Sequence, residues 1–272
     1  MQKTSNTAPS SIGILDWGIG GMGFYRALRE RYSDIPIHYL SDSGSTPYGR
    51  LSRMELRRRM ALVFGYFTEH GVRHLVVACN AASTVLMNMK EHDCGGGETL
   101  SIIGVIEPAV KGVLRNAARS LGVIGGERTI RSGVYRRLLS AHVPVILQRV
   151  AQPLSALIER GDSGSQTMKE SIARIMAPLR AVDTLLLACT HYAAIAPLLQ
   201  EGVPAAALVD PVPELLDWTE SAWGLSSWRG NGEERFTTTG NPAAMRHAAA
   251  VAFSIPIDRV ESVTLPPAGI SD

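Results

Sequence analysis

The stretch HLVVACNAASTV, residues 74–85, decides how this chain folds. An apolar run of strand length ends at Cys79, and a segment with the character of a helix start follows directly. Strands that are apolar on both faces are typical of parallel sheets that helices cover on both sides. Other strand-like and helix-like runs alternate along the chain, at 11–16, 22–32, 37–42, 52–71 and 81–92. The sequence therefore predicts an α/β fold with mainly parallel sheets.

The same arrangement returns about 110 positions later. TLLLACTHYAAI (184–195) repeats the opening stretch, with Cys189 where the first copy has Cys79. At nearly the same offset, SLGVIGGERTI (120–130) repeats SIGILDWGIGG (11–21). Two matches in one register indicate two homologous, pseudo-symmetric α/β halves, each with a cysteine at the carboxyl end of a strand.

This placement favours a chemical role for both cysteines. In open α/β sheets, ligands bind beyond the carboxyl ends of the strands. The start of a following helix supplies free N–H groups and a partial positive charge, which lower the pKa of a thiol and attract a carboxylate. A single cysteine at a strand end is usually a small buried residue. Two cysteines that are related by the repeat would instead line opposite walls of one cleft.

The composition narrows the class of protein. Of the 272 residues, 45% are hydrophobic and 19% charged, and the net charge of +2 gives no reason to expect a nucleic-acid or membrane partner. No apolar run has the length of a transmembrane helix, and the polar first residues lack the core of a signal peptide. Three cysteines do not make a disulfide framework. We therefore expect a soluble, cytoplasmic protein.

Three further features have structural rather than functional interpretations. A basic stretch fits a solvated helix face and contains Arg50, Arg53, Arg57, Arg58 and Arg59. Trp218, Trp223 and Trp228 fall in a segment that we expect to be helical and packed, although an exposed tryptophan there would indicate a homodimer surface. Cys94 lies in the glycine-rich run HDCGGGE, and we assign it no role.

Seven motifs follow one another in an order that resembles the cofactor-independent glutamate racemases of the aspartate/glutamate racemase superfamily. They are ILDWGIGG, TPYGR, ACNAAS, IGVIEP, RSGVY, ACTHY and FTTTGNP, and the resemblance extends from Ile12 to about Val263. It implies two α/β domains with the active site in the cleft between them. The first domain would comprise residues 1–101 and 210–272, and the second residues 102–209.

The resemblance also implies racemisation without pyridoxal phosphate or metal. The sequence offers no Rossmann or Walker motif and no metal-ligand set of histidines and cysteines. Inverting an α-carbon requires that a proton leave one face and that another arrive on the opposite face. Two thiol groups on opposite walls can do this, because an unperturbed thiol pKa of about 8.5 permits both protonation states near neutrality. Cys79 and Cys189 would fill these roles.

Other site residues are implied by the matching motifs. Asp16 would assist the first cysteine and His191 the second, with Glu159 as an acidic group near the second. Asn80 and Thr190 would hold the α-carboxylate of an amino-acid substrate. The remaining substrate-binding residues that the resemblance implies are Trp17, Pro47, Tyr48, Gly49, Ala81 and Thr129.

Two of these positions depart from the family pattern. Trp17 stands where the family has a serine, and Ala81 stands where it has a threonine. Both changes delete a hydroxyl, and polar contacts matter in a closed pocket for a charged substrate. Glutamate is the default substrate, which would link the enzyme to D-glutamate for peptidoglycan and the cell wall. A related two-cysteine racemase or isomerase of the aspartate, hydantoin or maleate type, and a non-catalytic small-ligand-binding relative, stay open.

Overall fold

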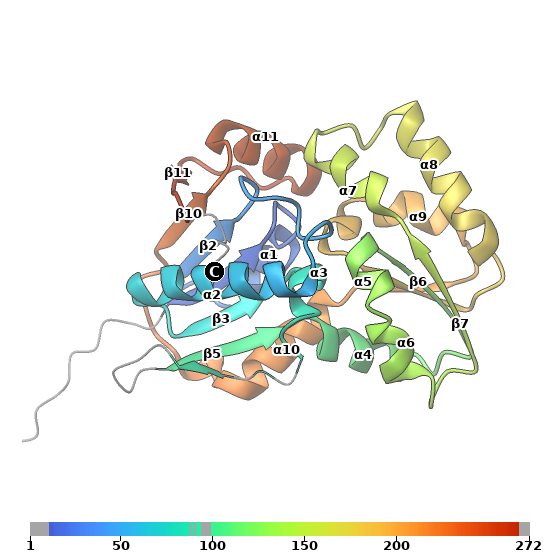
Figure 1. Cartoon of the computed structure of the whole chain (residues 1–272), viewed down its shortest axis with the longest axis horizontal. Helices are drawn as coiled ribbons and strands as arrows, with labels where there is room; N and C mark the ends of the chain where they lie inside the picture. The colour runs from blue at the N-terminus through green and yellow to red at the C-terminus, as the bar shows by residue number, and fades with distance from the viewer. Residues whose placement is uncertain (1–10, 88, 90, 94–98, 267–272) are drawn as a thin grey trace, which may run out of the picture.

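The computed structural model describes residues 11–87, 89, 91–93 and 99–266. Cys94, for which the sequence predicts no role, lies outside these residues. The described part folds into two sheets that lie side by side, each with helices packed against it (Figure 1). Within it, no helix combines the length and the apolar character needed to cross a membrane.

The first sheet takes its strands from both the N-terminal and the C-terminal parts of the chain. The N-terminal elements are β1 (Ile12–Asp16), α1 (Met22–Arg31), β2 (Ile37–Ser41), α2 (Arg53–Glu69), β3 (His74–Val77), α3 (Asn80–Ser83), β4 (Glu91–Asp93) and β5 (Thr99–Gly104). The C-terminal elements are α10 (Val212–Trp223), η3 (Leu225–Ser227), β10 (Glu234–Thr238), α11 (Pro242–Phe253) and β11 (Glu261–Ser262). The strand order is β11-β10-β2-β1-β3-β5-β4, and every neighbouring pair is parallel except β4 and β5.

The second sheet belongs to the middle of the chain. Its elements are α4 (Ile106–Arg115), β6 (Ser120–Gly125), α5 (Glu127–Arg131), α6 (Val134–Leu139), β7 (Val145–Val150), α7 (Gln152–Glu159), α8 (Gln166–Met176), η1 (Ala177–Leu179), β8 (Thr184–Ala188), η2 (Thr190–Ile195), α9 (Ala196–Gly202) and β9 (Ala207–Val209). The strand order is β7-β6-β8-β9, and all pairs are parallel.

The strand orders confirm the predicted repeat and the α/β fold class. The run β2-β1-β3-β5 of the first sheet corresponds to β7-β6-β8-β9 of the second. Gly13 pairs with Leu75 in one half, and Gly122 pairs with Leu185 in the other. At both glycines, an added Cβ would lie 3.0 Å from the leucine Cδ1, so the two halves share this close contact. The predicted boundaries, 1–101 with 210–272 and 102–209, stay a prediction.

Our prediction of a helix over residues 81–92 is wrong. Helix α3 ends at Ser83, and β4 pairs antiparallel with β5 where the helix was expected to finish. The Ser83 hydroxyl donates to the carbonyl of Val77 and accepts from the N–H of Val105, while the Thr84 hydroxyl donates to the carbonyl of Ala81. These hydroxyl groups form hydrogen bonds with backbone groups, and such bonds compete with those of a continuing helix.

Helix α2 begins as the sequence predicts and covers one face of the first sheet (Figure 1). Ser52 is its N-cap, and Glu55 completes a capping box. The expectation that all five arginines of the basic stretch are solvated is wrong for Arg59, which is only 6% exposed. Arg59 lies one turn from Leu56 and Val63 on the apolar face of the helix, where it meets a buried carboxylate.

The tryptophan-containing segment is only partly helical. Trp218 and Trp223 lie on α10, but the helix ends there and Trp228 follows η3. Trp223 and Trp228 pack against the hydrophobic core, as expected, whereas Trp218 is 37% exposed.

Candidate active site

The pocket at the carboxyl ends of the two sheets collects nearly all the predicted site residues. Those that line it are Asp16, Trp17, Pro47, Tyr48, Gly49, Cys79, Asn80, Ala81, Thr129, Cys189, Thr190 and His191. Its volume of about 60 Å³ has room for a few water molecules. Residues from the two halves therefore face one another across a small pocket.

Four lining residues were not predicted, namely Gly126, Gln152, Ser155 and Ala188. The repeat contains a signal for some of them. Gly126 occupies the place in the second copy that Trp17 has in the first. Strand β7 is the counterpart of β2. Gln152 and Ser155 follow β7, just as the Pro47–Gly49 loop follows β2 in the first half.

Cys79 lies one residue beyond the end of β3 and is the N-cap of α3. Its side chain is buried in the wall of the pocket. Burial raises the pKa of this thiol well above its usual value, and the negative charge of Asp16 raises it further, while N–H groups of Ala82 and Trp17 oppose the effect. Burial and the charge of Asp16 therefore favour the protonated form of Cys79.

Cys189 has a histidine as its hydrogen-bond partner. It follows β8 and is the N-cap of η2, and its Sγ lies 3.8 Å from Nδ1 of His191. The other ring nitrogen of His191, Nε2, lies 2.6 Å from Oε1 of Glu159. A thiol, an imidazole and a carboxylate are thus joined in one chain of hydrogen bonds.

The hydrogen bonds among Cys189, His191 and Glu159 stabilise charge on the last two side chains. Burial would lower the pKa of His191, but its hydrogen bonds with Cys189 and Glu159 raise it well above the usual value. Burial would raise the pKa of Glu159, but the hydrogen bond and the charge of His191 lower it below the usual value. The arrangement favours a histidinium–carboxylate pair beside Cys189.

Glu159 can occupy this position because Gly18 has no side chain. It does not line the pocket but accepts a hydrogen bond of 2.9 Å from the N–H of Ile19 in the first half. A Cβ at Gly18 would overlap the Glu159 carboxylate, and a Cβ at Gly20 would overlap the Thr190 hydroxyl. The glycines of the ILDWGIGG motif are therefore required by side chains that approach from the second half.

Asp16 also bonds across the two halves. Its Oδ2 accepts from the Thr190 hydroxyl at 2.7 Å, and its Oδ1 accepts from the N–H of Gly18 at 3.1 Å. Burial raises the pKa of Asp16, and the charge of His191 opposes this shift. The carboxylate lies among pocket-lining groups but bonds to Thr190, a residue for which we expected a role in substrate binding.

The two positions that depart from the family pattern both line the pocket. Ala81 contributes only a methyl group. The indole N–H of Trp17 donates to the carbonyl of Ser45 at 3.2 Å. This N–H is therefore already engaged and does not replace the missing serine hydroxyl as a donor to a substrate.

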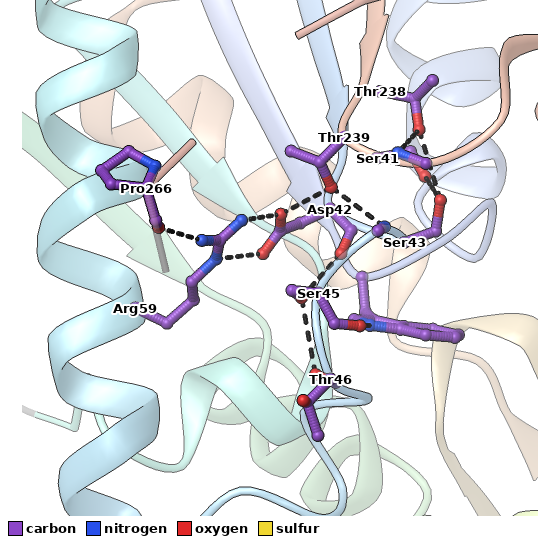
Figure 2. Close-up of polar contacts among 12 residues, drawn as sticks. Ser41, Asp42, Ser43, Ser45, Thr46, Arg59, Thr238, Thr239 and Pro266 are labelled. Carbon is purple, nitrogen blue, oxygen red and sulfur yellow. Dashed lines mark hydrogen bonds and ion pairs between the residues drawn. The ribbon is translucent and has the colours of Figure 1, made fainter. Parts of the chain in front are cut away.

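The Tyr48 wall of the pocket is anchored by a buried ion pair. Figure 2 shows the Asp42 carboxylate facing the Arg59 guanidinium, which donates from Nε at 2.7 Å and from Nη2 at 2.5 Å. Asp42 also accepts from the hydroxyl of Tyr48 at 2.7 Å and from that of Thr239 at 2.8 Å. Arg59 in turn donates to the carbonyl of Pro266. The loop after β2 is thus tied to α2 and to the C-terminal segment.

Asn80 is held by a residue that the sequence did not single out. The hydroxyl of Tyr135, on α6 of the second half, donates to Oδ1 of Asn80 at 2.5 Å. Thr129 is buried in the same wall region, with 1% of its surface exposed. In the described part of the chain, no three His, Cys, Asp or Glu side chains are grouped so that they could share a metal ion.

The chain is similar in sequence to known racemases. The family model for Asp/Glu/Hydantoin racemase matches residues 12–218. The chain is 34% identical to a glutamate racemase of Aquifex aeolicus over 194 residues, which cover 71% of this chain and 73% of that one. It is 32% identical to a glutamate racemase of Stutzerimonas stutzeri over 249 residues, which cover 86% of this chain and 90% of that one.

The fold agrees with this relationship. A crystal structure of glutamate racemase from Thermus thermophilus in complex with beta-chloro-D-alanine superposes with a TM-score of 0.80 at 27% identity. The match covers 94% of this chain and 98% of that one. Together with the family match over most of its length, this places the chain in the Asp/Glu/Hydantoin racemase family.

Proposed function

We propose that this protein is a cofactor-independent racemase that interconverts L- and D-glutamate, with Cys79 and Cys189 as its two acid–base groups. The observation that carries the proposal is the placement of the two cysteines. They follow the corresponding strands β3 and β8 of the two halves and line one pocket. Each can therefore serve one face of an α-carbon that is bound between them.

The local charges suggest how the first proton moves. Burial favours the protonated thiol at Cys79, whereas Cys189 lies 3.8 Å from His191, which is paired with Glu159. A thiolate at Cys189 takes the α-proton, and the Cys79 thiol delivers its own proton to the opposite face. The product is the inverted amino acid, and the two sulfurs have exchanged protonation states. The reverse reaction then starts from Cys79.

The intermediate carbanion needs support from the pocket. When the α-proton leaves, negative charge spreads onto the α-carboxylate, where hydrogen-bond donors stabilise it. Asn80 and Thr190 stand directly after the two cysteines and line the pocket. The Asn80 Nδ2 has no partner within the described residues, so it is placed to donate to this group, whereas the Thr190 hydroxyl already donates to Asp16.

Glutamate is favoured over the other substrates by the named relatives, two of which are glutamate racemases at 32% and 34% identity. A purely ligand-binding role is not favoured by a pocket that keeps both thiols and the His191–Glu159 pair. We further propose a cytoplasmic location and a role in supplying D-glutamate for peptidoglycan. Complementation of a bacterium that requires D-glutamate tests this role.

The reaction is tested by incubating the protein with L- or D-glutamate in deuterated water and following α-deuterium by NMR. Alanine and aspartate serve as comparison substrates. Cys79→Ala and Cys189→Ala should each lower racemisation by about 10²–10⁴-fold, the usual contribution of a general acid or base. Cys94→Ala is the matched control and should keep full activity. Full activity of either pocket variant would overturn the two-cysteine mechanism.

A further inference from the structure

Tyr135 contacts an active-site residue from outside the pocket. Its ring is fully buried on α6, and it does not line the pocket. The hydroxyl donates to Oδ1 of Asn80, which stands in the pocket wall of the other half. This contact joins the two halves at a residue for which we propose a role in holding the substrate carboxylate.

Among the described residues, the rest of the Asn80 side chain has no protein partner. The amide offers one acceptor oxygen and an NH₂ group with two donors. Asn80 is only 3% exposed, so Nδ2 has little access to water. Within the described residues, Nδ2 is buried and makes no hydrogen bond. Buried polar groups almost always have a partner, so an orphaned donor in a pocket wall indicates a ligand that supplies an acceptor.

The hydroxyl of Tyr135 determines which end of the amide faces the pocket. The two flipped orientations of an asparagine have nearly the same shape and differ in their hydrogen bonds. Burial raises the pKa of Tyr135 well above its usual value, so the hydroxyl keeps its proton and needs an acceptor. Only the orientation with Oδ1 toward Tyr135 provides that acceptor, and it leaves the NH₂ group to the pocket.

We propose that Tyr135 is a positioning residue whose hydroxyl holds the Asn80 amide with its NH₂ group toward the α-carboxylate of the bound amino acid. The identity of this ligand rests on the proposed function, whereas the orientation of the amide does not. In the flipped orientation, Oδ1 would meet a carboxylate oxygen and repel it. Because the carboxylate gains charge as the α-proton leaves, the correct orientation favours both binding and proton removal.

The kinetic test replaces Tyr135 with phenylalanine, which removes one oxygen and keeps the buried ring. We expect kcat/KM for glutamate to fall about tenfold to a hundredfold, with an increase in KM. In the Asn80→Ala background, the same substitution should have no further effect, because Tyr135 acts through Asn80. Tyr25→Phe is the control. Its hydroxyl donates to Glu234 at 2.7 Å outside the pocket, and kcat/KM should not change.

The second test observes the amide directly and does not depend on turnover. The chain has six asparagines, so selective ¹⁵N-asparagine labelling gives a simple side-chain NMR spectrum. We expect the Asn80 NH₂ signals to shift in Tyr135→Phe and, in the unaltered protein, to shift on addition of glutamate.

The outcomes separate the two proposals. The positioning role is overturned if Tyr135→Phe lowers kcat/KM equally in the unaltered protein and in Asn80→Ala. It is also overturned if the Asn80 NH₂ signals are unchanged in Tyr135→Phe, even when glutamate is racemised. If the protein racemises no glutamate but the NH₂ signals depend on Tyr135, the proposed function fails and the positioning role stands.

Discussion

Replacing Arg59 with methionine should destabilise this protein far more than the loss of a typical arginine on a helix. Arg59 is 6% exposed and Asp42 is fully buried, so the substitution leaves a carboxylate inside the protein without its counter-charge. Two charge-assisted hydrogen bonds, at 2.7 and 2.5 Å, are lost together. Removing one partner of a buried ion pair typically costs about 3–5 kcal/mol. For a chain of this size, that corresponds to a decrease in Tm of roughly 6–20 °C.

Thermal and urea unfolding measure this effect, and Arg235→Met provides the matched control. Arg235 pairs with Glu261 on the same sheet, but the two side chains are 40% and 32% exposed, and such pairs contribute about 0–1 kcal/mol. Adding Asp42→Asn to Arg59→Met should recover part of the stability, because it removes the stranded charge. KM for glutamate should rise in Arg59→Met, since Tyr48 bonds to the same carboxylate. Equal stability of Arg59→Met and Arg235→Met would refute the reasoning.

Three further predictions concern the pocket. Gly18→Ala should push the Glu159 carboxylate away from His191 and lower kcat by about a hundredfold, whereas an unchanged kcat would mean that the close approach is unimportant. The pKa of Glu159 is lowered and that of His191 raised, so their pairing stabilises the fold most between their usual values of 4.5 and 6.5 and weakens as the pH falls or rises through the shifted values. Glu159→Gln should therefore cost more stability in urea unfolding at pH 6 than at pH 10, and an equal cost at both would contradict the pairing. Trp17→Ser with Ala81→Thr restores two hydroxyls and should raise kcat/KM for glutamate about tenfold or more, while a slower double variant would show that Trp17 suits the glutamate pocket.

Local patterns explain why the fold and the two cysteines could be predicted. A continuous apolar run followed by a helix start is visible within a dozen residues, and its recurrence revealed the second half. Because parallel strands place their carboxyl ends at one edge, Cys79 and Cys189 were expected at a common site, and both line the pocket. The family resemblance added the partners of these cysteines, and His191 and Glu159 do lie together.

The sequence misled us where a side chain's environment comes from a distant segment. Arg59 looks like its exposed neighbours in the basic stretch, although its place on the apolar stripe of α2 was a signal. The helix expected over 81–92 ends early because Ser83 and Thr84 bond to backbone groups that the helical pattern does not reveal.

The sequence by itself determined the α/β class, the duplicated plan and the two cysteines at strand ends, because hydrophobic periodicity and strand-end residues are local properties. Only the tertiary structure decided that Asp42 pairs with Arg59, that Tyr135 bonds to Asn80 and that Gly18 makes room for Glu159. These contacts join residues from 17 to more than 100 positions apart, and the last two cross between the halves. A buried charge or hydroxyl is stable only beside its partner, and that partner is specified by how the two sheets pack rather than by the neighbouring sequence.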